Sequence, residues 1–545
     1  MRKPIKIKDP IYGYIEIDDE KVYSIINSSV FHRLQDIIQT SYSPVYPSSL
    51  HNRFVHSIGV YYLGKLALKA IKNNNNDIFP ENFDTLEETF LLACLLHDLG
   101  HAPFSHTGEK YFLLNHKGKV PLLRIKLQEI VNNEEFSDDD NELLAGAPHE
   151  LMSALEGIKL FHDFIEEDNK SFFARCIIGL KYKDKTDIRN CLIELLNSKT
   201  IDVDKLDYLI RDSYYTGFKT LNIDYHRLLS SLYIISDKNS NKSLGFTKAA
   251  LSTLESVIIA HDMERKWIQN HPTIQYETQL LNAILQTQID KYKEYGIDLF
   301  SLESLTEEGS KGKKKIYIDQ QKAVELPIEI RLLSDSDIIA AMKNDYNNQL
   351  VQEYFNRAKR KKVLWKSESE YRILFEQGIL SQPAVESLES KFDSIIETYT
   401  APSSLPIIND SLLNYVNEEI KKIHITDLSK ELKDAKQKEF SEVKYLLENI
   451  KNFSEKNNYS FEYVLISNKQ FYSSFNKDEL KNINIKFDDE IVKPLEKSIN
   501  LFEQKEPREK FFYIYVTPED RKEFDVKGFC KVLFDCAYKK YGDNN

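Results

Sequence analysis

The stretch that decides the fold of this chain is LLHDLGHAPFSH, residues 95–106. It follows TFLLAC, residues 89–94, an apolar run without Gly or Pro that predicts a buried helix. Gly100 and Pro103 then predict the end of that helix. Three histidines and an aspartate at the end of a core helix are costly to bury unless they bind something, and a metal ion is the first candidate.

The composition is that of a large globular protein with an acidic balance. The chain has 545 residues, of which 41% are hydrophobic and 12% aromatic, enough for a large core. The N-terminus has no apolar signal segment, and no run reaches the roughly 18 apolar residues of a membrane span, so we expect a cytoplasmic protein without membrane contact. A net charge of −12 argues against duplex nucleic acid as a partner, but a local positive pocket could still bind a small anion.

Hydrophobic periodicity predicts a mainly α fold, with a helical core over residues 1–375 and a smaller C-terminal α+β lobe over residues 376–545. Residues 5–23 alternate polar and apolar side chains about a turn, which predicts a short hairpin before the helices. Strand and helix patterns in the lobe fall at residues 461–466, 511–516 and 526–538. The five cysteines form no C-x-x-C pair, so we expect buried thiols rather than disulfides or structural zinc.

Two charged stretches interrupt the core pattern. Residues 117–148 include an acidic segment, which we interpret as an exposed insertion because no fixed spacing of metal ligands appears in it. Residues 310–315 read SKGKKK, and here we expect a solvated basic turn rather than a binding patch.

The other metal ligands must come from elsewhere in the chain. His56 lies on a predicted helix that begins near His51, and the segment IDVDKLDYLIRD, residues 201–212, carries a polar stripe at helical spacing. The stripe consists of Asp204, Asp207, Tyr208, Arg211 and Asp212. A set of two imidazoles and two carboxylates suits Mn, Fe, Mg or Zn and leaves room for a water molecule, whose pKa the metal lowers.

Four motifs in this order carry a resemblance to a known family. They are DPIYG at 9–13, HNRFVHSIGV at 51–60, HDLGHAPFSH at 97–106 and DVDKLDY at 202–208. Together they resemble the deoxynucleoside triphosphate (dNTP) triphosphohydrolases of the HD superfamily, a group that includes the vertebrate SAM-and-HD-domain restriction factor and many bacterial proteins. The resemblance covers residues 5–375.

The resemblance implies an enzyme that hydrolyses a dNTP at its α-phosphorus and yields a deoxynucleoside and inorganic triphosphate. Carried over position by position, its single divalent metal ion would be bound by His56, His97, Asp98 and Asp204. The catalytic groups that the resemblance implies are His101, His106, His149 and Glu150. The histidines would supply protons or stabilise charge as the 5′-oxygen leaves.

The resemblance also implies residues that contact the substrate. They are Gln39 at the deoxyribose 3′-hydroxyl, Arg53 and Lys205 at the phosphates, and Tyr208 and Asp212 near the sugar and phosphates. The family's triphosphate-gripping helix corresponds to residues 261–271, where the expected arginine and tyrosine do not align. Arg265 and Lys266 stand there as substitutes, since either side chain can bind phosphate.

Other functions remain open at this stage. The altered helix is compatible with an HD-type nucleotidase or phosphodiesterase that acts on another nucleotide or on the end of single-stranded DNA. A non-enzymatic nucleotide sensor, or a subunit of a larger assembly, is the third hypothesis. By resemblance alone we also expect a homo-oligomer. A nucleotide effector and a role in antiviral defence are left open.

Overall fold

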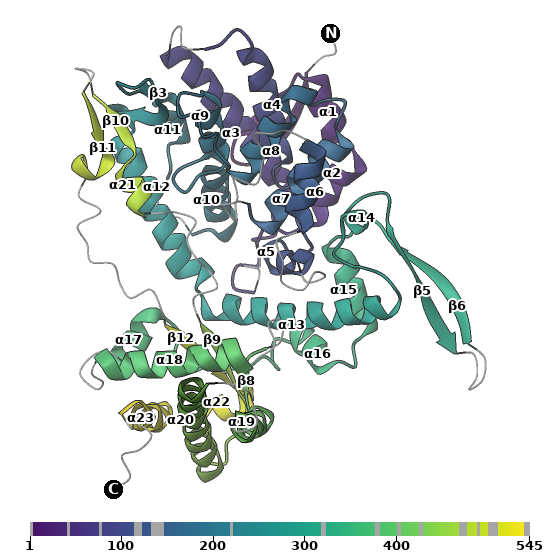
Figure 1. Cartoon of the computed structure of the whole chain (residues 1–545), viewed down its shortest axis with the longest axis vertical. Helices are drawn as coiled ribbons and strands as arrows, with labels where there is room; N and C mark the ends of the chain where they lie inside the picture. Colours follow the sequence, from purple (N-terminus) through teal and green to yellow (C-terminus); the bar gives the residue numbers. More distant parts are fainter. Residues whose placement is uncertain are drawn as a thin grey trace. The chain divides into compact units, whose positions relative to one another are not determined.

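The computed structural model describes part of the chain in enough detail for analysis. The described residues are 4–40, 44–75, 79–113, 122–131, 146–218, 222–317, 323–375, 382–399, 405–423, 429–467, 477–487, 491–499 and 511–538. Helices predominate among them and the sheets are small (Figure 1), which confirms the mainly α fold with a smaller α+β region. Within these residues, every helix is too short or too polar to cross a membrane.

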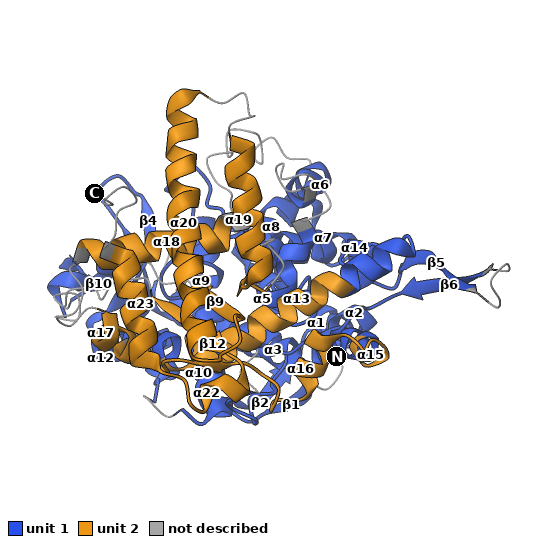
Figure 2. Ribbon diagram, turned by 90° about the horizontal axis from the view of Figure 1, so that it is seen from below, with its two compact units in different colours: residues 1–266, 288–341, 473–505 blue, residues 267–287, 342–472, 506–545 orange. Residues whose placement is uncertain are grey.

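The chain divides into two compact units (Figure 2). Unit 1 contains residues 1–266, 288–341 and 473–505, and unit 2 contains residues 267–287, 342–472 and 506–545. These units differ from the two domains expected from the sequence, because the segment before residue 375 contributes to both and the C-terminal segment returns to unit 1. A domain boundary at residue 375 therefore stays a prediction.

Unit 1 is built mostly from helices. They are α1 (Glu20–Ile26), α2 (Ser29–Arg33), α3 (Arg53–Asn74), α4 (Phe83–Leu96), α5 (His106–Glu109), α6 (Leu122–Val131), α7 (Pro148–Leu160), α8 (Lys170–Ile178), α9 (Arg189–Leu196), α10 (Val203–Thr216), α11 (Tyr225–Ser230), α12 (Leu251–Glu264), α14 (Leu302–Leu305) and α21 (Lys477–Lys481). Helix α3 packs against both α4 and α10. Both α3 and α10 begin at a side-chain cap, with Asn52 accepting from the Val55 N–H and Asp202 from the Lys205 N–H. These caps fix where the candidate ligands on the two helices lie.

The strands of unit 1 form two hairpins and one four-stranded sheet. They are β1 (Ile5–Asp9), β2 (Gly13–Ile17), β3 (Leu232–Ser236), β4 (Lys242–Thr247), β5 (Ser310–Tyr317), β6 (Ala323–Ile330), β10 (Asn484–Lys486) and β11 (Val492–Pro494). The sheet has the order β11-β10-β4-β3, and β10 runs parallel to β4 although the two are far apart in sequence. The β1–β2 pair confirms the hairpin expected near the N-terminus.

The expectation of a basic turn at residues 310–315 is wrong. These residues belong to β5, which pairs in antiparallel register with β6 over its whole length. The register places Gly312, Lys314 and Ile316 on the same face as Leu326 and Ile328. Three consecutive lysines hide this period-2 pattern, because they break the alternation by which a strand is recognised.

Unit 2 contains the second sheet, in the order β7-β12-β9-β8, with helices around it. Its elements are α16 (Gln349–Phe355), α17 (Glu368–Phe375), α18 (Gln382–Tyr399), α19 (Asp410–Ile423), α20 (Lys430–Lys456), α22 (Pro518–Arg521), α23 (Val526–Tyr538), β7 (Lys362–Val363), β8 (Ile407–Ile408), β9 (Tyr463–Ser467) and β12 (Phe512–Val516). Every residue of β9 and β12 is buried. The two strands and closing helix expected in the lobe are confirmed. Two helices, α13 (Pro272–Glu294) and α15 (Asp335–Asn344), contribute residues to both units.

The acidic insertion predicted between residues 117 and 148 lies largely outside the described residues. Within it the structure describes α6 and the start of α7. The exposed character expected for its acidic part stays a prediction.

Candidate metal centre

Buried side chains hold the loop that carries the HDLGH motif in place. The Arg33 guanidinium donates to the backbone carbonyls of Leu99 (2.6 Å) and His101 (2.9 Å). From the other side, the Ser153 hydroxyl accepts from the Gly100 N–H at 2.9 Å. A Cβ on Gly100 would lie 2.5 Å from the Ser153 backbone nitrogen, so only glycine lets helix α7 approach this closely.

The end of the same loop adopts a strained backbone. Phe104 and Ser105 have φ values of 60° and 52°, a region that residues other than glycine rarely occupy. Asp335 compensates by accepting from the Phe104 N–H at 2.6 Å, and the Ser105 hydroxyl donates to the Ile38 carbonyl at 2.5 Å. Strain held by several hydrogen bonds is typical of functional sites, because the rest of the fold must stabilise it.

The four predicted ligands come together at one point of unit 1. The His56 Nε2 atom lies 3.3 Å from the His97 Nε2 atom, 3.0 Å from Asp204 Oδ1 and 3.4 Å from Asp98 Oδ2. His97 Nε2 lies 3.4 Å from Asp98 Oδ1 and 3.6 Å from Asp204 Oδ1. All are buried except Asp204, whose side chain is 33% exposed and marks the side open to solvent.

The far nitrogen of each imidazole already has an acceptor. His56 Nδ1 donates to Asp207 Oδ2 at 2.7 Å, and His97 Nδ1 donates to the carbonyl oxygen of Cys94 at 2.9 Å. In the neutral rings both Nε2 atoms therefore carry lone pairs that point into the site. This is the arrangement of metal-binding histidines, whose second nitrogen is fixed by a carboxylate or a carbonyl.

A chain of buried charges supports Asp207. Arg211 donates to both oxygens of this carboxylate, at 2.8 and 2.9 Å, and the Tyr12 hydroxyl donates to Oδ1 at 2.7 Å. Arg211 in turn donates to Asp9 Oδ2 at 2.9 Å. Through Tyr12 and Asp9, the DPIYG motif of the N-terminal hairpin thus helps to hold the carboxylate that orients His56.

Close packing of α3 on α10 makes these contacts possible. A Cβ atom on Gly59 would lie 2.1 Å from Asp207 Oδ1 and 2.5 Å from an Arg211 guanidinium nitrogen. Any other residue would displace the carboxylate that holds His56. The close approach of Asp207 and Arg211 therefore explains why the HNRFVHSIGV motif has glycine at position 59.

The donor set fits a divalent metal ion. Ligand atoms of His56, His97 and Asp204 all lie within 4.8 Å of one another, and Asp98 adds a second carboxylate beside them. Lone pairs and carboxylates that face one another at these distances repel unless a cation lies among them. The pKa of His56 also reflects the need for positive charge in this group. Burial opposes the charged form of His56, but hydrogen bonds to Asp204 and Asp207 raise its pKa to about 9.

A second group of histidines adjoins the first and centres on Glu109. Glu109 Oε1 lies 2.5 Å from His106 Nδ1 and 3.3 Å from His101 Nδ1, and Oε2 lies 2.8 Å from His149 Nδ1. The rings of His101 and His149 stack with centroids 4.1 Å apart. His101 also reaches the first group, since its Nε2 lies 3.1 Å from Asp98 Oδ1.

Electrostatics distinguish the members of the Glu109 group. Burial opposes ionisation of Glu109, but His149 and His106 hold its pKa well below the usual range. Burial likewise disfavours the charged form of His149, yet Glu109 raises the pKa of this histidine to about 9. His149 is thus protonated at neutral pH, and the 70% exposed side chain of His106 faces solvent. Either histidine can deliver a proton to a bound molecule.

The structure gives Glu150 contacts outside this group. Its Oε2 accepts from the Ala147 N–H at 2.6 Å at the start of α7, and its Oε1 accepts from the Asn197 side chain at 2.9 Å. Glu150 therefore caps a helix and ties α7 to the end of α9. A catalytic role for it stays a prediction without support from these contacts.

Two predicted phosphate ligands are engaged in buried ion pairs. Arg53 donates to Asp98 Oδ2 at 2.7 Å and to the Ser105 hydroxyl at 2.9 Å, so it lies beside the predicted metal ligands. Lys205 donates to Asp202 Oδ2 at 2.6 Å and to the Ser198 carbonyl at 2.7 Å. Direct phosphate contact by either residue stays a prediction.

The remaining predicted contacts surround the same region. Gln39 is buried, and its backbone carbonyl accepts from Arg53 at 3.3 Å. Its side-chain Oε1 has no hydrogen-bond partner among the described residues. Asp212 pairs with His51 Nε2 at 2.6 Å, and Tyr208 is half-buried on α10.

The helix expected to grip the triphosphate is irregular. Helix α12 ends at Glu264 and continues as a π-helix from Arg265 to Gln269. Arg265 is half-buried and Lys266 is exposed. Both Arg265 and Lys205 help to lower the pKa of His261, after burial, which places positive charge around this histidine. A π-helical turn re-aims side chains and is frequent at functional sites.

Sequence reasoning missed several residues that build the centre. Glu109 joins three histidines, and Asp207, Arg211, Asp9 and Tyr12 form the support of His56. A signal for Glu109 was present, because it follows His106 by three positions and so shares its helix face. Asp207 and Arg211 were on the polar stripe, but spacing alone does not separate a ligand from the residue that holds it.

Comparison with known proteins identifies the domain that carries these residues. The family model described as HD domain matches residues 53–197. This chain contains an HD domain. Three of the four predicted ligands fall inside the HD match, and Asp204 lies just beyond its end.

Curated relatives match about half of the chain. An uncharacterized protein from Mycoplasma genitalium is 30% identical over 46% of this chain and 53% of its own length. The deoxynucleoside triphosphate triphosphohydrolase SAMHD1 of Danio rerio is 33% identical over 42% of this chain and 36% of its own length. The Homo sapiens protein of that name is 28% identical over 51% and 44%. The chain spans about half the length, or less, of these relatives.

Two solved structures share the fold over nearly the whole chain. A hypothetical protein from Aquifex aeolicus has a TM-score of 0.56 at 17% identity and covers 96% of this chain and 99% of its own. A phosphohydrolase from Bacteroides thetaiotaomicron has a TM-score of 0.55 at 19% identity, with coverage of 94% and 99%. At such identity these neighbours show a common fold.

Proposed function

We propose that this chain is a metal-dependent phosphohydrolase that converts dNTPs to deoxynucleosides and inorganic triphosphate. The convergence of His56, His97, Asp98 and Asp204 inside a shell of fixed partners carries the proposal. The match of part of the chain to triphosphohydrolases named SAMHD1 supports the choice of substrate.

In this proposal His56 and His97, together with Asp98 and Asp204, bind one divalent metal ion. A bound metal of this kind would acidify a water molecule and polarise a phosphoryl oxygen. The chain's own task is to keep the four ligands rigid, which it does through Asp207 and the Cys94 carbonyl. Arg53 limits the negative charge of Asp98 and contributes positive charge beside the phosphates.

The Glu109 group would provide the proton for the leaving 5′-oxygen. His149 is protonated at neutral pH because of Glu109, and His106 is exposed with its Nδ1 on the same carboxylate. A positioned imidazolium that donates to the leaving alkoxide lowers the barrier to bond cleavage. His101 stacks on His149 and links the proton donors to Asp98.

Gln39 would recognise the sugar. A buried amide oxygen without a partner is costly, and a hydroxyl donor from a ligand removes that cost. The deoxyribose 3′-hydroxyl is such a donor. Because Gln39 adjoins Arg53, sugar and phosphate would be read side by side.

Product analysis tests the proposed reaction. Purified protein is incubated with Mn²⁺ or Mg²⁺ and each dNTP and NTP, alone and in mixtures, and the products are separated by ion-exchange chromatography. Deoxynucleoside plus intact triphosphate supports the proposal, and a His97→Ala variant should form neither. Monophosphate plus pyrophosphate contradicts it and favours another nucleotidase or phosphodiesterase activity. The irregular turn at Arg265 is compatible with such an activity.

If every nucleotide remains intact, the enzymatic proposal fails and the sensor hypothesis takes its place. Gel filtration with and without dNTPs then measures whether nucleotides change the size of the particle. The same measurement tests the homo-oligomer that we propose from the resemblance.

A further inference from the structure

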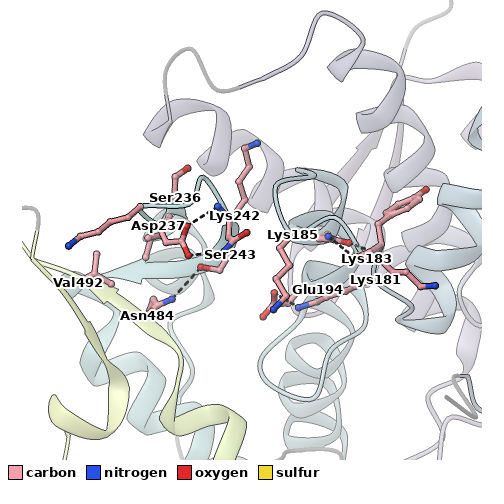
Figure 3. Close-up of a pocket in the computed structure, with 15 residues that line it drawn as sticks. Lys181, Lys183, Lys185, Glu194, Ser236, Asp237, Lys242, Ser243, Asn484 and Val492 are labelled. Atoms are coloured by element: carbon pink, nitrogen blue, oxygen red, sulfur yellow. Dashed lines mark hydrogen bonds and ion pairs between the residues drawn. The ribbon is translucent and has the colours of Figure 1, made fainter. Parts of the chain in front are cut away.

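Unit 1 contains a cavity built from residues other than those of the candidate metal centre (Figure 3). Its volume is about 790 Å³, within the range of small-molecule sites. Three segments line it: α9 with the connection that precedes it, the β3–β4 hairpin, and the β10–β11 pair. The C-terminal segment thus returns to unit 1 and completes this cavity.

The lining of the cavity is basic although the protein is acidic. It contains Lys181, Lys183, Lys185, Lys238 and Lys242. Glu194 and Asp237 are the acidic residues of the lining, which leaves an excess of three positive charges in a chain of net charge −12. Ammonium groups that share a concave surface repel one another and raise the local concentration of anions.

The first lysine segment is rigid. Lys181, Lys183 and Lys185 are exposed, Tyr182 is buried between the first two, and Lys185 lies in a turn. The Asn190 side chain accepts from the Tyr182 N–H at 2.6 Å and donates to the Asp184 carbonyl at 2.8 Å. The backbone that carries the three lysines is therefore held in place by Asn190.

The opposite wall is a turn that is fixed in the same way. Asp237 Oδ1 accepts from the N–H groups of Asn239 and Asn241 at 2.8 and 2.9 Å. The two walls are joined directly, since the Lys242 N–H donates to the Lys185 carbonyl at 2.8 Å. Asn484 on β10 donates to Ser243 at 3.2 Å and closes the third side (Figure 3).

We propose that this cavity binds a polyphosphate group, either inorganic or as the tail of a nucleotide. Lysine is a point-charge ligand for phosphate, and several lysines on one concave surface attract the same anion together. Among the described residues of the lining, Tyr182 is the one aromatic side chain. Its ring is already engaged by the guanidinium groups of Arg175 and Arg189, 4.4 and 3.9 Å from the centroid. A stacking surface for a base is therefore not part of the site, and the phosphates carry recognition.

Calorimetry on the full-length, EDTA-treated protein tests the proposal with inorganic tripolyphosphate as the probe. The test variant is Lys183→Gln, Lys185→Gln and Lys238→Gln, three substitutions at exposed positions. The matched control is Lys311→Gln, Lys313→Gln and Lys315→Gln on β5, where the lysine side chains are 71%, 72% and 64% exposed. Both triple variants remove three positive charges.

We expect the cavity variant to bind tripolyphosphate at least about tenfold more weakly than the original chain, and the β5 control within about twofold, because specific charged contacts are lost only in the first. Equal weakening in both variants would mean general electrostatic attraction and would overturn the site. No binding to the original chain would overturn it as well.

Two further probes identify the source of the phosphates. Equal affinity for ATP and tripolyphosphate, with none for adenosine, supports recognition of the phosphate chain alone. Tighter binding of ATP that the cavity variant abolishes supports a nucleotide tail. Preference for single-stranded DNA over both, with a steep salt dependence, would contradict a small-polyanion site. Because EDTA removes the metal, these results stand whether or not the proposed hydrolysis is correct.

Discussion

The two histidine groups of the HD domain differ in how their rings are held. In the metal group, His56 and His97 each have one nitrogen fixed by a single buried acceptor, so each ring presents a defined lone pair. In the Glu109 group, three imidazoles share one carboxylate. One of them, His106, is largely exposed. The first arrangement suits metal ligands, which must keep a fixed orientation. The second suits proton transfer, because a proton can pass between the imidazoles and a bound molecule.

Removal of a metal ligand should have the largest effect. Asp98→Ala deletes a carboxylate and leaves the buried Arg53 without its ion-pair partner, so we expect loss of detectable hydrolysis together with loss of bound metal. Elemental analysis and the chromatographic assay measure the two effects. His162→Ala, at a 62% exposed histidine, serves as the control and should change neither. Full metal content in Asp98→Ala would place the metal elsewhere.

Substitutions in the Glu109 group should separate chemistry from metal binding. We expect His149→Ala and His106→Ala to lower kcat by about 10²–10⁴-fold, the usual contribution of a general acid. Metal content should stay at the level of the original chain, because the proposed ion is bound by the group of His56, His97 and Asp204 and not by the separate group that contains His106 and His149. Loss of metal in these variants would show that the two groups are one site.

The support of His56 should matter less than the ligand itself. Asp207→Asn keeps the shape of the side chain but removes the charge that holds both His56 and Arg211. Such changes behind a metal ligand weaken metal binding by about 10–100-fold. Titration with a chelator measures the affinity. Unchanged affinity would contradict the idea that rigidity of His56 comes from this carboxylate.

Part of the candidate site could be predicted from the sequence, and part could not. The resemblance pointed to His56, His97, Asp98 and Asp204, which the structure brings together, whereas the helical stripe alone does not separate Asp204 from Asp207 and Asp212. Metal binding by these four residues stays a prediction. Glu109 could not be assigned a role, since only the fold brings His149 to it from α7. Charge runs were the least informative, because the same lysine-rich pattern at residues 310–315 suits a turn or a strand.

The pH profile provides a finer test of the Glu109 group. Glu109 raises the pKa of His149 to about 9, so the acid form is present at neutral pH and is lost as the pH rises through that value. Glu109→Gln removes the charge, and burial then lowers the pKa of His149. We expect the alkaline limb of log kcat against pH to move to lower pH. A limb that stays in place would exclude His149 as the titrating acid.

The smallest expected effect concerns Glu156, which lies beneath the HDLGH loop on α7. This glutamate is fully buried, and neither carboxylate oxygen has a hydrogen-bond partner among the described residues. Burial raises its pKa to about 8, although Arg33 acts in the opposite direction. A raised pKa in the folded state means that the neutral acid stabilises the fold at low pH, and that this contribution declines above the ordinary pKa and is lost as the pH passes about 8. Glu156→Gln mimics the neutral acid, so its melting temperature should equal that of the original chain at about pH 4, below the ordinary pKa of a glutamate. At pH 9 we expect it to exceed the original by about 2 °C. The exposed substitution Glu308→Gln should show no such pH-dependent difference from the original chain. Equal melting temperatures of Glu156→Gln and the original chain at pH 9 would mean that Glu156 finds a counter-charge as it ionises.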